Sequence, residues 1–70
     1  MANSNRSKQR KDELRRAVGE IADIKSSLTE AYSRFDSITD PELMDACIYE
    51  ISALRSRYDY AVRRAKARLS

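Results

Sequence analysis

Apolar side chains recur every three or four residues along two stretches of this chain, which is the spacing of one face of an α-helix. The first stretch holds two heptad rows: Leu14, Ile21, Leu28 and Phe35, and Ala17, Ile24, Ala31 and Ile38. The second holds Met44, Ile51, Tyr58 and Ala65, and Cys47, Leu54 and Ala61. The apolar stripe is widened by Val18 and Tyr32, and by Ile48, Val62 and Leu69. The pattern predicts two amphipathic helices, over about 12–37 and about 40–68.

A strong helix-start signal separates the two stretches. Thr39 is followed three residues later by Glu42, which is the spacing of a capping box, and Ile38 and Leu43 have the spacing of a hydrophobic staple. These two signals favour Thr39 as the cap. Asp40 as the cap, with Pro41 in the first helical position, is a competing register. Both registers predict a turn at about 38–40.

The fold class that follows is all-α: a two-helix antiparallel hairpin, similar to a coiled coil, over residues 12–70. A chain of 70 residues buries little apolar surface by itself, and the stripe is wider than one antiparallel partner needs. We therefore expect the hairpin to complete a helical bundle by oligomerisation. A symmetric dimer is the commonest closed solution, although a larger ring or another protein as partner would also cover the stripe.

Two segments depart from the helical pattern. Residues 1–11 contain no apolar side chain after Ala2 and are rich in basic and small polar residues, which predicts a flexible or fraying basic arm. Gly19 stands inside the first predicted helix, where glycine costs about 1 kcal/mol relative to alanine. We expect close helix approach or local flexibility at this position.

The composition offers little chemistry for catalysis. Histidine is absent and Cys47 is the sole cysteine, which excludes an internal disulfide, a histidine acid–base pair and the usual zinc ligand sets. Cys47 falls on the core stripe, as does Tyr58. The sequence predicts a protein that is not an enzyme and holds no cofactor or metal. Short apolar runs without a leader or bilayer-length span favour a cytoplasmic protein that does not enter a membrane.

Charge is distributed unevenly along the chain. Residues 1–16 contain six basic and two acidic side chains, residues 17–50 two and eight, and residues 51–70 six and one. A hairpin brings the two basic segments together at the end opposite the acidic turn. We call this end the basic pole: Arg10, Lys11, Arg15, Arg16, Arg57, Arg63, Arg64, Lys66 and Arg68.

The basic pole allows two interpretations. It could bind the phosphate backbone of nucleic acid without reading its sequence, because no reading motif accompanies it. It could equally serve assembly, since an antiparallel dimer lays the basic pole of one copy against the acidic turn of the other. Cations near a helix C-terminus are also favoured by the helix dipole alone.

A second stripe lies away from the core on the second predicted helix. It consists of Tyr49, Ala53, Ser56 and Tyr60, and we call it the tyrosine stripe. Small residues between two tyrosines permit close approach and supply amphipathic aromatic area, so the stripe is a candidate interaction face. Scattered surface tyrosines are the alternative interpretation.

The second half of the chain also resembles a known family. The stretches Asp40–Leu43, Asp45–Glu50 and Ala53–Leu54, together with Arg57–Tyr58, Tyr60 and Ala65–Lys66, resemble the YaaL family of short bacterial proteins of unknown function. Ile24, Lys25, Leu28, Ala31 and Phe35 resemble the family's first helix. The resemblance implies a cytoplasmic helical hairpin from Gram-positive-type bacteria, often encoded near the recombination-repair protein RecR. It implies no catalytic or cofactor residues.

The sequence thus predicts a non-enzymatic protein–protein interaction or adaptor module that forms a homo-oligomer or binds an unidentified protein partner. The alternative is a nucleic-acid-binding accessory factor that uses the basic pole.

Overall fold

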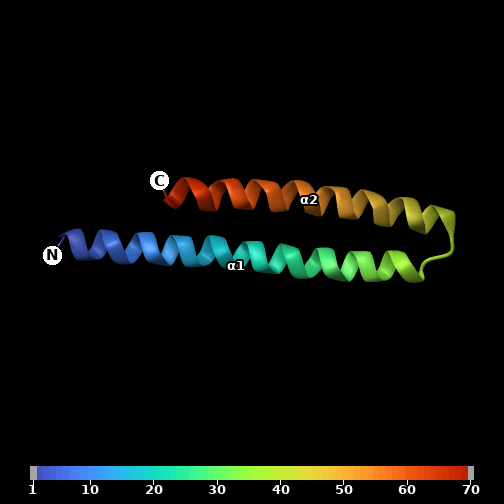
Figure 1. The fold of residues 1–70 in the computed structure, drawn as a ribbon, viewed down its shortest axis with the longest axis horizontal. Coiled ribbons are helices and arrows are strands. Elements are labelled where there is room, and N and C mark those ends of the chain that lie inside the picture. The colour runs from blue at the N-terminus through green and yellow to red at the C-terminus, as the bar shows by residue number, and fades with distance from the viewer. Residues whose placement is uncertain (1, 70) are drawn as a thin grey trace.

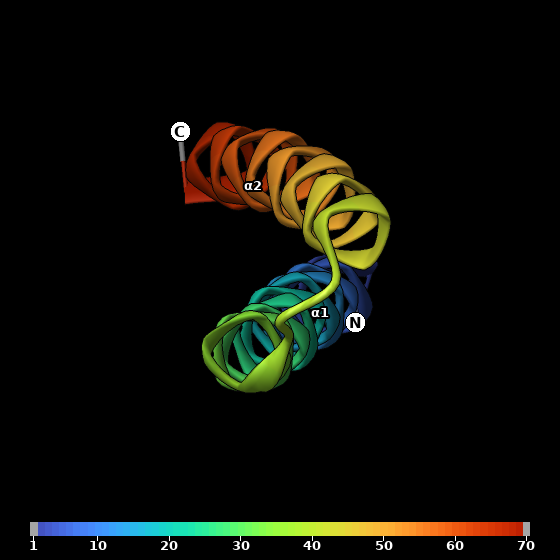
Figure 2. The ribbon, with the colours of Figure 1, turned by 90° about the vertical axis from the view of Figure 1, so that its right-hand side faces the viewer.

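The computed structural model describes the backbone of residues 2–69 and the side chains of residues 6–69. It contains two helices, α1 (Ala2–Ser37) and α2 (Pro41–Leu69), which run antiparallel and lie side by side along their lengths (Figures 1 and 2). The molecule is a rod whose Cα atoms extend over 60 × 15 × 11 Å. The prediction of an all-α helical hairpin is confirmed.

The first helix begins earlier than the sequence pattern predicts, at Ala2 and not near residue 12. The segment 2–11 contains no proline or glycine, and six of its ten residues are alanine, arginine, lysine or glutamine, which are good helix formers, so the helix continues without an apolar face. Because α1 has 36 residues and α2 has 29, the start of α1 projects beyond the end of α2 (Figure 1). The flexibility of the basic arm stays a prediction. Two residues of the predicted segments lie outside the described residues: Met1 of the basic arm and Ser70 of the hairpin.

The cap of α2 is Asp40, so the preference for Thr39 is wrong. One carboxylate oxygen of Asp40 accepts hydrogen bonds from the backbone N–H groups of Glu42 at 2.8 Å and Leu43 at 3.3 Å. The residue before a proline is disfavoured in the helical region, so Asp40 cannot be the first helical residue and takes the capping position instead. Leu43 remains 58% exposed, and the expected staple does not bury it.

The contact between the helices is made mainly by small side chains. We call this line of contact the seam, and its buried members are Ala17, Ala31, Cys47, Leu54, Ala61 and Ala65. The thiol of Cys47 donates a hydrogen bond to the backbone carbonyl of Ala31 at 3.3 Å, which places α2 directly against the backbone of α1. Among the described residues, no large side chain is fully buried.

Gly19 does not mark a close approach of the two helices. A Cβ atom added at Gly19 would meet nothing within 4 Å, so the expectation of close approach is wrong, whereas local flexibility at this position stays a prediction. The exposed side of α1 carries this glycine, where no neighbour requires the absence of a side chain.

Candidate interaction surfaces

The larger apolar side chains flank the seam on one side of the hairpin. Their heptad positions put them beside the small residues of the seam, and Leu28 and Tyr32 of α1 line a shallow depression together with Tyr58 of α2. The two flanking rows therefore lie next to each other across the seam. We call this surface the apolar face: Leu14, Val18, Ile21, Leu28, Tyr32 and Phe35 from α1, and Met44, Ile48, Ile51, Tyr58, Val62 and Leu69 from α2.

Much of the apolar face is open to solvent. Eight of its twelve side chains are half-buried, and the other four are exposed: Val18 by 54%, Tyr32 by 46%, Ile48 by 49% and Leu69 by 70%. Monomeric soluble proteins rarely expose a contiguous apolar surface of this extent, and such surfaces mark interaction sites. The close approach at the small-residue seam explains the exposure, because it leaves the larger side chains beside the contact.

The other side of the seam is charged. Arg34 of α1 pairs with Glu50 of α2 near the turn, and Arg68 of α2 donates to a carboxylate oxygen of Glu13 at 2.7 Å near the opposite end. Because their side chains are 34–53% exposed, these ion pairs stabilise the fold only slightly. They join α1 and α2 across the seam near each end of the hairpin.

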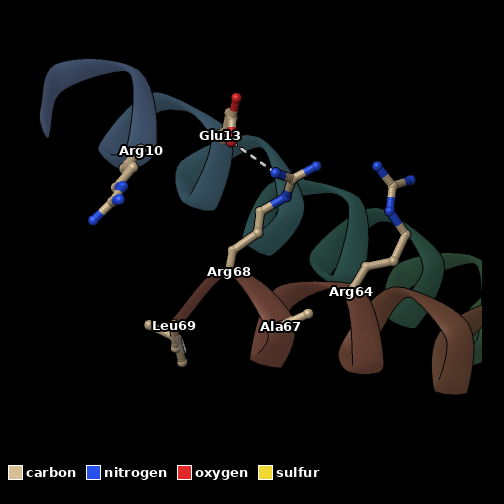
Figure 3. Close-up of a pocket in the computed structure, with 6 residues that line it drawn as sticks. All are labelled: Arg10, Glu13, Arg64, Ala67, Arg68 and Leu69. Atoms are coloured by element: carbon tan, nitrogen blue, oxygen red, sulfur yellow. Dashed lines mark hydrogen bonds and ion pairs between the residues drawn. The ribbon is translucent and has the colours of Figure 1, made fainter. Parts of the chain in front are cut away.

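The structure brings part of the predicted basic pole together. Arg10, Arg64 and Arg68 line one open depression, where Arg68 reaches across to Glu13 and the other two guanidinium groups lie on either side (Figure 3). Arg16 lines the adjoining depression with Arg64 and Arg68. The remaining members of the basic pole are also exposed: Lys11, Arg15, Arg57, Arg63 and Lys66. Of these, Arg57 lies nearer the turn and lines another depression with Arg64.

Sequence reasoning missed the carboxylates that lie among these arginines. Glu13 and Glu20 line the depression that Arg64 and Arg68 also line, and Asp23 lies with Arg57 and Arg64 in the next one. The spacing of these glutamates could have revealed their position. Glu13 and Glu20 are seven residues apart and directly precede Leu14 and Ile21, so they lie on one side of the helix, next to the apolar stripe. The carboxylates reduce the positive charge on this side of the pole.

The tyrosine stripe lies on α2 away from the seam. All four of its residues are exposed, Tyr49 by 76% and Tyr60 by 56%. The guanidinium of Arg64 stands 5.8 Å from the centre of the Tyr60 ring, within the range of a cation–π contact. Tyr60 is thus joined to the charged side of the hairpin, whereas Tyr49 stands close to the turn.

The described part of the chain contains neither a metal-ion cluster nor a membrane-spanning helix. No group of three or more Cys, Asp or Glu side chains there could hold a metal ion. Neither described helix is long and apolar enough to cross a bilayer.

Fold and surface define the class: a small helical hairpin with one apolar face that neither of its own helices covers. The chain belongs to the family described as "Protein of unknown function (DUF2508)", which matches residues 1–69. The resemblance to a family of short proteins of unknown function is thereby confirmed, and the YaaL name is compatible with it. Comparison with curated proteins and with solved structures gave no match.

Proposed function

We propose that this protein is a non-enzymatic interaction module whose working surface is the apolar face. The observation that carries the proposal is the exposure of Val18, Tyr32, Ile48 and Leu69 beside a row of half-buried apolar residues. Burying a valine, leucine or isoleucine side chain contributes about 1.5–3 kcal/mol relative to full exposure. Covering side chains that are already half-buried would therefore yield roughly 1 kcal/mol each, enough in sum to hold a partner.

The residues with reactive side chains support a role without catalysis. Cys47 is 4% exposed within the seam, and its thiol contacts the Ala31 carbonyl. The carboxylate of Asp40 caps α2, while Glu13 and Glu50 pair with arginines. Each of these groups has a structural partner, and none stands over an enclosed cavity with a second group that would activate it.

Photo-crosslinking in living cells tests the proposal. A photoreactive amino acid placed at Ile48, on the apolar face, should give a discrete adduct. The same amino acid placed at Ala53 is the matched control, because Ala53 is also exposed on α2 but lies in the tyrosine stripe. Failure to obtain any adduct from position 48 would refute the proposal. An adduct from position 53 alone would show that the partner binds the tyrosine stripe and not the apolar face.

The second candidate function is a nucleic-acid-binding accessory factor. The observation that favours it is the meeting of Arg10, Arg64 and Arg68 at one end of the rod, with further exposed cations around them. Contacts to phosphates release counterions, so binding would weaken steeply with salt. The carboxylates of Glu13 and Glu20 act against this function.

Titration of labelled duplex and single-stranded DNA and RNA at several salt concentrations tests the second candidate. Replacing Arg63 and Arg64 by glutamine should weaken binding and lower the salt slope by about 0.9 for each lost duplex contact. Replacing Lys25 and Arg34 by glutamine removes the same charge away from the pole and is the matched control. Absence of binding even at low salt would remove nucleic acid from consideration.

A further inference from the structure

We propose that the apolar face is covered by the apolar face of a second copy, in antiparallel order, so that the turn of each hairpin lies over the terminal end of the other. This inference rests on the proposed function and names the partner of the same surface. The product is a symmetric four-helix bundle in which each small-residue seam is covered by the neighbouring copy.

The apolar face has the size that a stable dimer needs. Its α2 row runs from Met44 to Leu69, or about 39 Å at 1.5 Å per residue, and the hairpin is 15 Å wide at its Cα atoms. The face thus measures roughly 600 Å² per copy, or roughly 1,200 Å² when two copies meet, which is at the lower end of the range of specific interfaces.

Exposed apolar side chains occur in both halves of the face, as a self-complementary surface requires. Tyr32 and Ile48 lie in the half near the turn, and Val18 lies in the half near the chain ends. Leu69 lies at the terminal edge of that half, where it also lines the depression of Arg10 and Arg68 (Figure 3). In an antiparallel pair, the turn half of one copy meets the terminal half of the other. These four exposed side chains then lie over the apolar face of the partner copy.

Charge decides between the two possible orders of the copies. Residues 30–50, around the turn, carry six carboxylates and one arginine. Residues 6–16 and 63–69, at the other end, carry ten basic and two acidic side chains. The antiparallel order sets these opposite charges over each other, whereas the order with both turns at one end sets like charges together and is disfavoured.

The middle of the face favours the same order. Arg55 and Asp59 stand one helical turn apart on α2 and line the depression that also contains Leu28 and Tyr58. In the antiparallel order, the two-fold axis of the dimer passes between Arg55 and Asp59. The α2 helix of the second copy then runs in the opposite direction over this point, so Arg55 of each copy meets Asp59 of the other. In the order with both turns at one end, α2 of one copy lies over α1 of the other copy. Arg55 then meets Lys25 of the other copy, so two positive charges face each other.

Sedimentation equilibrium of the full chain tests self-association. We expect twice the mass of one chain. Ile48→Glu should weaken the dimer at least about a hundredfold, because it buries a carboxylate in each half of the interface. Val18→Glu should act in the same way, and Ala53→Glu, on the tyrosine stripe, should leave the dimer intact. Circular dichroism confirms that each variant stays helical under the conditions used.

Distances between spin labels test the order of the copies. A label at Thr39→Cys, in a chain that also carries Cys47→Ala, sits in the turn. The antiparallel order predicts a label-to-label distance of about 40 Å or more, set by the length of α2. The opposite order predicts about 20 Å or less.

Each result has a definite meaning. A chain that is monomeric at all concentrations, or a dimer weakened by Ala53→Glu and not by Ile48→Glu, would overturn the self-pairing. Short label distances would overturn the antiparallel order. If the chain is a monomer and photo-crosslinking from position 48 still captures another protein, the proposed function stands and only its self-partner fails.

Discussion

Removing the Asp40 cap should destabilise the hairpin by a measurable and local amount. In Asp40→Ala, the N–H groups of Glu42 and Leu43 lose the carboxylate oxygen that now accepts from them at 2.8 and 3.3 Å. Both groups are exposed and regain water, so the loss is that of an ordinary cap, about 1 kcal/mol within a range of about 0.5–2. For a chain of this size, that corresponds to a fall in Tm of about 4–8 °C.

The assay is urea unfolding followed by circular dichroism at 222 nm, at one chain concentration for all variants. Thr39→Ala is the matched control, since the structure assigns the cap to Asp40, and it should change the free energy of unfolding by less than about 0.5 kcal/mol. Asp40→Asn should retain most of the stability, because asparagine also caps well. A larger loss in Thr39→Ala than in Asp40→Ala would refute the reasoning and restore the capping box.

Three further predictions concern single positions. Gly19→Ala should stabilise the protein by roughly 1 kcal/mol, seen as a higher Tm, because the new methyl group meets nothing within 4 Å and alanine favours the helix. A lower Tm would show that the position is crowded. Glu50→Gln should change the free energy of unfolding by less than about 1 kcal/mol in urea titrations, because its pair with Arg34 is solvent-exposed. Cys47 should react with a thiol reagent much more slowly in buffer than in denaturant, because its side chain is buried against Ala31. Equal rates would mean that the seam opens readily.

The hairpin was predictable because two independent signals agree. The heptad rows define one apolar stripe on each helix, and the turn carries a proline preceded by a capping residue. The sequence indicates both Thr39 and Asp40 as caps, and the preference for Thr39 is wrong because the capping-box pattern does not include the steric effect of Pro41 on Asp40. The start of α1 was missed because the apolar pattern stops at Leu14, whereas the helix continues to Ala2 through polar residues that form no apolar face.

The candidate surfaces were only partly predictable. The sequence shows which positions are apolar, but it does not show which of the two heptad rows is buried between the helices. The structure distinguishes them: the row containing Ala17 and Ala31 lies at the seam, and the row containing Ile21 and Leu28 lies beside it, half-exposed. This difference depends on how closely two helices approach, which heptad spacing does not specify. The carboxylates within the basic pole were missed for a related reason, since charge counted by segment ignores helical faces.

The seam of small side chains has a consequence for the life of the protein in a cell. Its alanines hold the helices together with few atoms, while most of the larger apolar side chains beside them remain half-buried or exposed. A hairpin of this kind gains its remaining stability from whatever covers it. We expect newly made copies without a partner to unfold often and to be cleared by proteases. The amount of protein that accumulates would then follow the supply of its partner more closely than the rate of its own synthesis.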